Sequence, residues 1–166
     1  LRDDCLVAVM QGLRTQRYGA GAVLDDYERT LFERAPHPAL PDPSAGPLRL
    51  HEVTVPADWA DYNGHMHESR YLQVLGDACD ALYRAVGIDA RYLKACGSYY
   101  TVETHLRFLA EVAPNERLVV ATQVLGLDEK RLHLWNELRR ASDDEVVATG
   151  EQMCVHVDAT TKRSAP

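Results

Sequence analysis

The chain has 166 residues, of which 46% are hydrophobic and 26% charged, as expected for a folded globular domain. Its formal net charge of -7 argues against a nucleic-acid-binding surface, which is usually basic. No apolar run approaches the roughly 18 residues of a membrane span, and no signal peptide is visible. Because the first residue is Leu1 rather than Met, we expect the chain to be part of a longer protein.

Residues 1–35 have the pattern of two helices. Apolar residues recur at spacings of three and four on both sides of a break at Gly19-Ala20-Gly21. The stripes are Leu6, Val7, Met10 and Leu13, then Val23, Leu24, Tyr27, Leu31 and Phe32. Five prolines follow in residues 36–47, which predicts a semi-rigid linker before a folded domain at residues 48–166.

That domain has the pattern of one strand, a long helix, a short helix and four more strands. The first strand spans residues 48–55, the long helix ends at Gly87, and Asp89 caps a short helix through Lys94. The later strands are predicted at residues 99–112, 117–125, 131–140 and 146–157, with turn residues between them. The polar residues 160–166 are expected to fray. This order favours an α+β fold.

The cysteines are widely spaced and form no Cys-x-x-Cys pair: Cys5, Cys79, Cys96 and Cys154. Cys79 falls on the apolar face of the predicted long helix, where a free thiol is more common than a disulfide. We therefore predict free thiols in a reducing compartment and a cytoplasmic protein.

The rest of the domain is organised around residues 59–71, Trp-Ala-Asp-Tyr-Asn-Gly-His-Met-His-Glu-Ser-Arg-Tyr. Asp61, Asn63 and His65 alternate in a polar stretch that runs directly into the long helix. A helix N-terminus offers unpaired N–H groups and a partial positive charge, so it can hold an oxyanion. The stretch therefore combines a carboxylate, an amide and an imidazole with an anion-stabilising helix end.

At these residues the chain resembles the acyl-CoA thioesterases of the hot-dog fold, in which an antiparallel sheet wraps a central helix. From Asp61 to Ala81, and again over Ser98 to Leu106, it is most similar to the thioesterase domain fused to bacterial L-carnitine dehydrogenase, whose proposed substrate is betainyl-CoA. The resemblance runs from about Leu48 to the C-terminus. One departure is His67, where many relatives carry Asn.

The resemblance implies hydrolysis of a short acyl-CoA, expected here to be betainyl-CoA, without a cofactor. It also implies a homodimer or a dimer of dimers with the active site between subunits. Residues 1–35 resemble the C-terminal tail of the 3-hydroxyacyl-CoA dehydrogenase family, which suggests an upstream dehydrogenase domain. A helical extension specific to this protein is the alternative.

The predicted catalytic residues are Asp61, Asn63 and His65. Asp61 would attack the thioester or activate water, Asn63 would donate to the carbonyl or orient the water, and His65 would bond the carboxylate or the water. Backbone N–H groups from His65 to Glu68 are candidates for the oxyanion hole. Gly64 and Met66 of the same motif are assigned to substrate binding.

A trimethylammonium group has no N–H, so aromatic faces and carboxylates must hold it. We predict Glu103 as its counter-charge, with Tyr71 and Trp135 as walls. Strand alternation predicts that Thr101, Glu103, His105 and Arg107 share one face. A solvated or dimer-contacting face is the alternative for this polar set.

Other interpretations of the motif stay open. Asp61 and Asn63-Gly64 could simply form a turn and a helix cap. No metal site is predicted, because His65 and His67 lack further ligands at a recognisable spacing. Ser69 lies outside any Gly-x-Ser-x-Gly context, and no Gly-x-Gly-x-x-Gly for a dinucleotide is present. An enoyl-CoA hydratase on the same fold, or a non-enzymatic module that binds CoA or a quaternary ammonium, remains a rival.

Overall fold

The structure, a computed structural model, describes residues 46–165, so the predicted helices of residues 1–35 and most of the linker lie outside it. The elements follow the predicted order. They are β1 (Leu48–Thr54), η2 (Ala57–Trp59), α3 (Glu68–Ala85), α4 (Ala90–Ala95), β2 (Gly97–Phe108), β3 (Arg117–Leu127), β4 (Arg131–Arg140) and β5 (Val146–Asp158).

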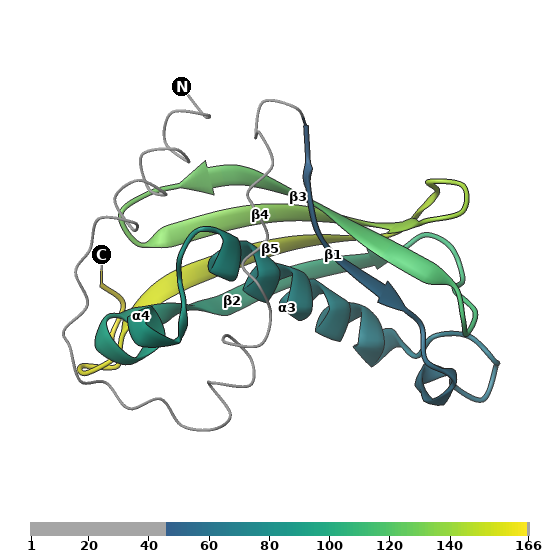
Figure 1. Cartoon of the computed structure of the whole chain (residues 1–166), viewed down its shortest axis with the longest axis horizontal. Coiled ribbons are helices and arrows are strands. Elements are labelled where there is room, and N and C mark those ends of the chain that lie inside the picture. Colours follow the sequence, from purple (N-terminus) through teal and green to yellow (C-terminus); the bar gives the residue numbers. More distant parts are fainter. Residues whose placement is uncertain (1–45, 166) are drawn as a thin grey trace.

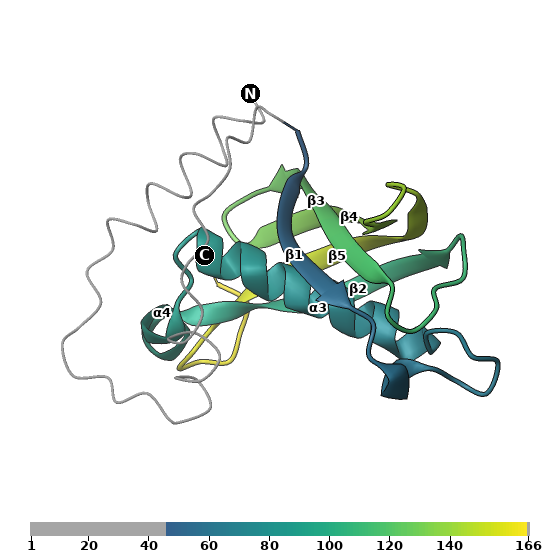
Figure 2. The same ribbon diagram turned by 45° about the vertical axis from the view of Figure 1, so that its right-hand side comes forward.

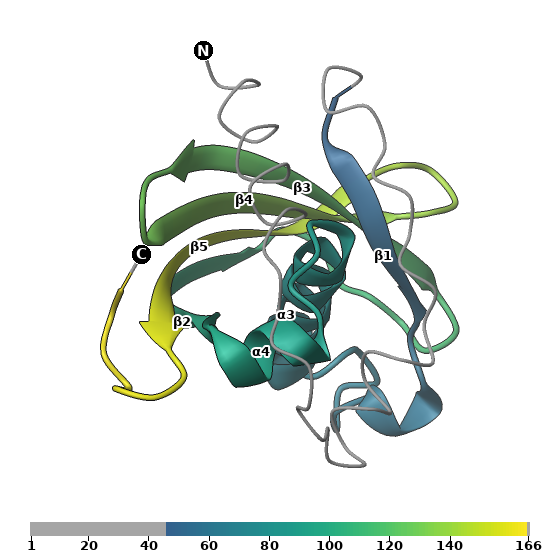
Figure 3. The same ribbon diagram turned by 60° about the vertical axis from the view of Figure 1, so that its left-hand side comes forward.

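All five strands form one antiparallel sheet in the order β1-β3-β4-β5-β2. The sheet curves around α3, which lies in its concave side (Figure 1 and Figure 3). Turned by 45°, the molecule shows β1 and β3 crossing over the same helix (Figure 2). This arrangement confirms the predicted α+β hot-dog fold.

The core forms where the apolar face of α3 meets the concave face of the sheet. Tyr71, Val74 and Leu75 are all buried on α3, and their spacing in the sequence places them on one face of the helix, as predicted. Leu75 packs directly on the backbone of β5, where a Cβ added at Gly150 would lie 2.3 Å from its Cδ1. Glycine at this position lets the helix approach the sheet closely.

Both ends of α3 are capped. His67 is the N-cap residue, and its Nδ1 accepts a hydrogen bond from the Ser69 N–H at 3.2 Å. The imidazole therefore fills the capping role for which Asn is a common residue, at the position where the motif departs from its relatives. Gly87 follows the helix with a φ of +91°, as its predicted C-terminal role requires.

The structure corrects the predicted face of the strand after the helices. A register shift between Thr101 and Glu103 places these two residues on opposite faces of β2. Thr101 points toward α3, with its Oγ1 3.6 Å from the Cys154 Sγ. Glu103 pairs with Met153 on the outer face, because the adjacent Gln152 points inward to accept a hydrogen bond from Cys79.

Two further expectations about segment ends were wrong. β2 stops at Phe108 rather than residue 112, since the N–H groups of Leu109 and Ala110 both bond the Val147 carbonyl. Residues 160–165, which were expected to fray, are held to the sheet: Ser164 forms a β-bridge with Val157, and the Asp158 carboxylate binds the Thr160 and Thr161 N–H groups. The described helices include none that is long and apolar enough to cross a membrane.

Candidate active site

The loop before α3 is a tight turn closed around Asp61. The carboxylate of Asp61 accepts a hydrogen bond from the Asn63 N–H at 2.7 Å and a longer one from the Asn63 side-chain amide at 3.4 Å. Gly64, with a φ of +83°, returns the chain so that the Asp61 N–H bonds the His65 carbonyl. These hydrogen bonds, that of the Asn63 backbone first, lower the pKa of Asp61 below its usual value of 3.8. The group is therefore a carboxylate at neutral pH.

Backbone hydrogen bonds fix where this loop meets the rest of the fold. The Met66 N–H donates to the Val112 carbonyl at 2.8 Å, and the His67 N–H donates to the Trp59 carbonyl at 2.9 Å. Within the predicted oxyanion segment this leaves the Glu68 N–H without a hydrogen bond to any described residue. The His65 N–H instead interacts with the Asp61 carboxylate and helps to lower its pKa. Glu68 is the first residue of α3, so its N–H also lies at the positive end of the helix.

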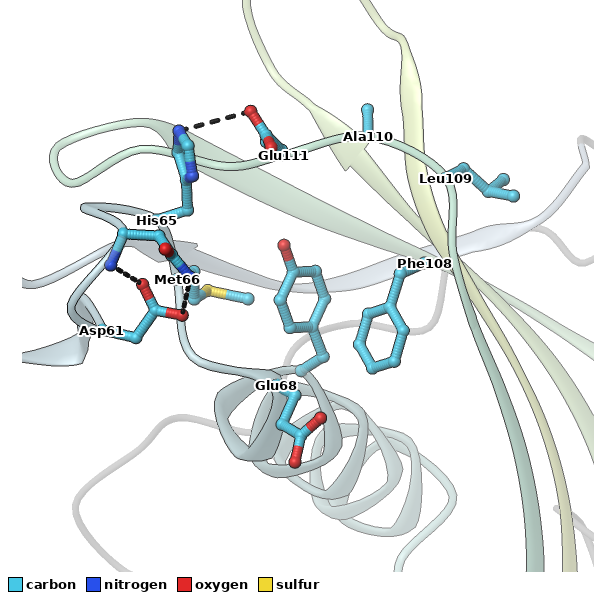
Figure 4. Close-up of a pocket in the computed structure, with 10 residues that line it drawn as sticks. Asp61, His65, Met66, Glu68, Phe108, Leu109, Ala110 and Glu111 are labelled. Carbon is cyan, nitrogen blue, oxygen red and sulfur yellow. Dashed lines mark hydrogen bonds and ion pairs between the residues drawn. The ribbon is translucent and has the colours of Figure 1, made fainter.

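An open cavity of about 820 Å3 lies beside this helix end. Three segments line it. The loop supplies Asp61, Asn63, His65 and Met66, the first turn of α3 supplies Glu68 and Tyr71, and the end of β2 with its extension supplies Phe108, Leu109, Ala110 and Glu111 (Figure 4). The cavity thus brings together the three predicted catalytic side chains with Met66 and Tyr71.

Aromatic rings form one side of this cavity. Tyr71 and Phe108 meet edge to face, with ring centroids 5.1 Å apart. Tyr71 is buried, and this burial raises the pKa of its hydroxyl. Phe108 keeps 51% of its surface exposed toward the cavity and the free edge of β2. The pair offers an apolar, polarisable surface beside the catalytic loop.

His65 reaches across the cavity to a residue that the motif does not contain. Its Nε2 lies 3.3 Å from the Glu111 Oε2, as the dashed line in Figure 4 shows. The pair links the catalytic loop to the segment that leaves β2. The His65 imidazole therefore contacts Glu111 and not Asp61, which His65 reaches through its backbone.

Two predicted substrate contacts lie elsewhere. Trp135 pairs with Glu151 in the sheet and, like Glu103, points away from α3 on the convex face. Neither residue lines the cavity, so a contact of Glu103 or Trp135 with substrate stays a prediction. The described residues include no group of three His, Cys, Asp or Glu side chains that could hold a metal ion.

Comparison with known proteins shows the family of this chain. The thioesterase-like superfamily model matches residues 55–166. The chain belongs to this superfamily. It is 44% identical over its whole length to an L-carnitine dehydrogenase/betainyl-CoA thioesterase of Rhizobium meliloti, of which it covers 34%. It is also 42% identical, over 72% of the chain and 76% of the relative, to a betainyl-CoA thioesterase of Pseudomonas aeruginosa.

Solved structures of this superfamily have the same fold. A thioesterase-type protein of Pseudomonas putida is 41% identical, with a TM-score of 0.63 over 72% of this chain and 77% of that one. A Staphylococcus aureus protein solved in complex with CoA is 26% identical, with a TM-score of 0.64 over the same shares of the two chains. Our chain spans about a third of the length of its fused relatives, such as that of R. meliloti (34%).

Sequence reasoning missed the cavity wall after β2. Phe108, Leu109, Ala110 and Glu111 were assigned to the interior of a strand, because the residues 99–112 look continuous. Glu68 was considered only for its backbone. No local motif marks Glu111, whose position depends on a break in strand pairing some 45 residues beyond the catalytic loop.

Proposed function

We propose that this domain hydrolyses a short acyl-CoA thioester, betainyl-CoA, to glycine betaine and CoA. The proposal depends on one observation: the Asp61 carboxylate lies in a cavity beside the free Glu68 N–H at the start of α3. Relatives named betainyl-CoA thioesterase support the choice of substrate. The longer relatives support a further proposal, that the domain works joined to a carnitine dehydrogenase domain.

In the proposed reaction the thioester carbonyl points at the first turn of α3, where the Glu68 N–H stabilises the developing oxyanion. Asp61 either takes a proton from water as the water attacks, or attacks the carbonyl carbon itself. The C–S bond then breaks, and the CoA thiolate takes the proton that Asp61 received from water. Direct attack instead leaves a mixed anhydride, which water hydrolyses at the Asp61 carbonyl carbon, so that the carboxylate is restored and the proton released goes to the thiolate. Single turnover in oxygen-18 water distinguishes the two routes, because only direct attack leaves the label in the Asp61 carboxylate.

We further propose that the working unit is a homodimer formed through β2. This strand pairs only with β5 among the described strands, and its other edge carries exposed Tyr100 and Val102, 52% and 62% exposed. An unpaired apolar edge favours strand addition by a second copy. Two copies joined there would close the cavity next to Phe108, which suits an active site between subunits.

The test is release of CoA, followed with a thiol reagent, from betainyl-CoA and acetyl-CoA. Asp61→Asn should lower kcat by about 10²–10⁴-fold. The loop should keep its conformation, because the Asn side-chain oxygen can still accept a hydrogen bond from the Asn63 N–H. Turnover that survives Asp61→Asn would refute the assigned role. Hydration of an enoyl-CoA without CoA release would favour a hydratase, and tight binding without turnover would favour a binding module.

A further inference from the structure

We infer that Glu111 selects the acyl group by its charge, together with the Tyr71 and Phe108 rings, so that the cavity favours acyl groups carrying a fixed positive charge. This inference rests on the proposed thioesterase function and assigns the recognition to residues that line the catalytic cavity. It places the counter-charge at Glu111 instead of Glu103.

The first support is the charge of the cavity wall. The residues that line it include three carboxylates, Asp61, Glu68 and Glu111, and no Lys or Arg. The Asp61 carboxylate accepts a hydrogen bond from the Asn63 N–H and is assigned to the reaction itself. In Figure 4 the Glu68 carboxylate points down and away from His65. Glu111 lies across the cavity from Glu68 and beside His65 (Figure 4), in the same cavity as the aromatic pair.

The second support is that Glu111 is held in place. Its Oε2 contacts the His65 Nε2 at 3.3 Å, and its backbone carbonyl accepts a hydrogen bond from Arg140 at 2.9 Å. Because both its carboxylate and its backbone are held, Glu111 loses less conformational entropy when a ligand binds. The carboxylate is 78% exposed, so it faces the open cavity and carries no large desolvation cost.

The third support is that one nearby basic group, Arg140, is neutralised by carboxylates, and that another, Arg70, is engaged by Trp59 and Gln73. Arg140 forms ion pairs with Glu116 at 3.2 Å, with Asp143 at 3.4 Å and with Glu145. Arg70, in the first turn of α3, lies over the Trp59 ring at 5.3 Å and bonds Gln73. The local field at the cavity is therefore negative and attracts a cation.

The fourth support is the chemistry of the rings. A quaternary ammonium cannot donate a hydrogen bond, so it binds to aromatic faces beside a carboxylate. Phe108, which is 51% exposed, supplies such a surface in the same cavity, with the buried Tyr71 ring packed edge to face against it. A cavity with both features suits a trimethylammonium acyl group and disfavours an anionic acyl group such as succinyl.

The decisive experiment compares two acyl-CoA substrates of the same shape. In tert-butylacetyl-CoA a neutral carbon replaces the charged nitrogen of betainyl-CoA. We expect wild-type kcat/KM to favour betainyl-CoA, and Glu111→Gln to lower this ratio roughly tenfold, as expected for a unit charge about 6 Å away near the surface. The Gln oxygen can still accept from His65, so the substitution removes charge and keeps the contact. Rising salt should shrink the wild-type ratio, since exposed charges are screened.

The matched control is Glu129→Gln, an exposed carboxylate in the turn between β3 and β4, which should leave the ratio unchanged. If Glu111→Gln lowers kcat/KM equally for both substrates, Glu111 acts through His65 in the reaction and the charge-selection inference is overturned. No change in kcat/KM for either substrate would also overturn it. Both results are compatible with the proposed thioesterase function. Failure of wild-type protein to release CoA from both substrates would instead refute the proposed function.

Discussion

The start of α3 allows the proposed oxyanion donor to be removed almost alone. Glu68 is the first helical residue, a position where proline is well tolerated because its N–H is free of intrahelical bonds. The preceding residue, His67, has φ of −59° and ψ of 141°, which is the conformation a residue before proline prefers. Glu68→Pro should therefore delete one N–H and keep the helix.

The matched variant is Glu68→Ala, which also lacks the carboxylate but keeps the N–H. Loss of one oxyanion-hole donor costs about 10²–10³ in kcat, so we expect Glu68→Pro to be slower than Glu68→Ala by that factor. The assay is CoA release from tert-butylacetyl-CoA, which keeps acyl charge out of the comparison. KM should change little, and urea unfolding should show both variants within about 1 kcal/mol of each other. Equal kcat values for the two variants would refute the assignment of the Glu68 N–H.

Three further predictions concern pH, packing and assembly. Because Asn63 lowers the Asp61 pKa, the carboxylate stays ionised as pH falls through the usual range, so Asp61 should add no acid limb to kcat/KM between about pH 7 and about pH 5; an acid limb in this range that persists in His65→Gln refutes the argument. Gly150→Ala should lower the free energy of unfolding by about 1–3 kcal/mol, since its Cβ would strike Leu75. Gly76→Ala, on the exposed side of α3 with open space around it, should raise it by about 0.5–1 kcal/mol, and the same sign for both would contradict the packing. Val102→Lys on the free edge of β2 should give a monomer in sedimentation, and an unchanged dimer would contradict pairing through β2.

The elements that were predictable are those with local patterns. The apolar face of α3, the alternation of β4 and the turns at Asn115 and Asp144 each have a signature within a few residues. That Asp61, Asn63 and His65 would lie together was predictable too, since they fall within five consecutive positions, whereas their catalytic role stays a prediction. Their side chains meet in one cavity because the loop and the helix that follows are continuous in the chain.

The bulge in β2 was not predictable from alternation alone. The alternation of side chains along a strand does not reveal an inserted residue. One extra residue moves every later side chain of the strand to the opposite face of the sheet. Val102 is that residue, so Glu103 moved from the expected substrate side to the convex face. The same limit applies to Trp135, whose face depends on which side of the sheet α3 covers.

Glu111 shows why the acyl side of the site needed a structure. Its contact with His65 joins positions 46 residues apart, and it arises because the chain leaves β5 after Phe108 and runs to Val112, whose carbonyl holds Met66. The hydrogen bond that anchors the catalytic loop therefore also brings Glu111 to the cavity. In the two proposals made above, catalytic geometry and acyl selectivity therefore share this one backbone connection. A change at Val112 that shifted it should alter both turnover and the ratio between charged and neutral substrates, whereas Glu111→Gln should alter only the ratio.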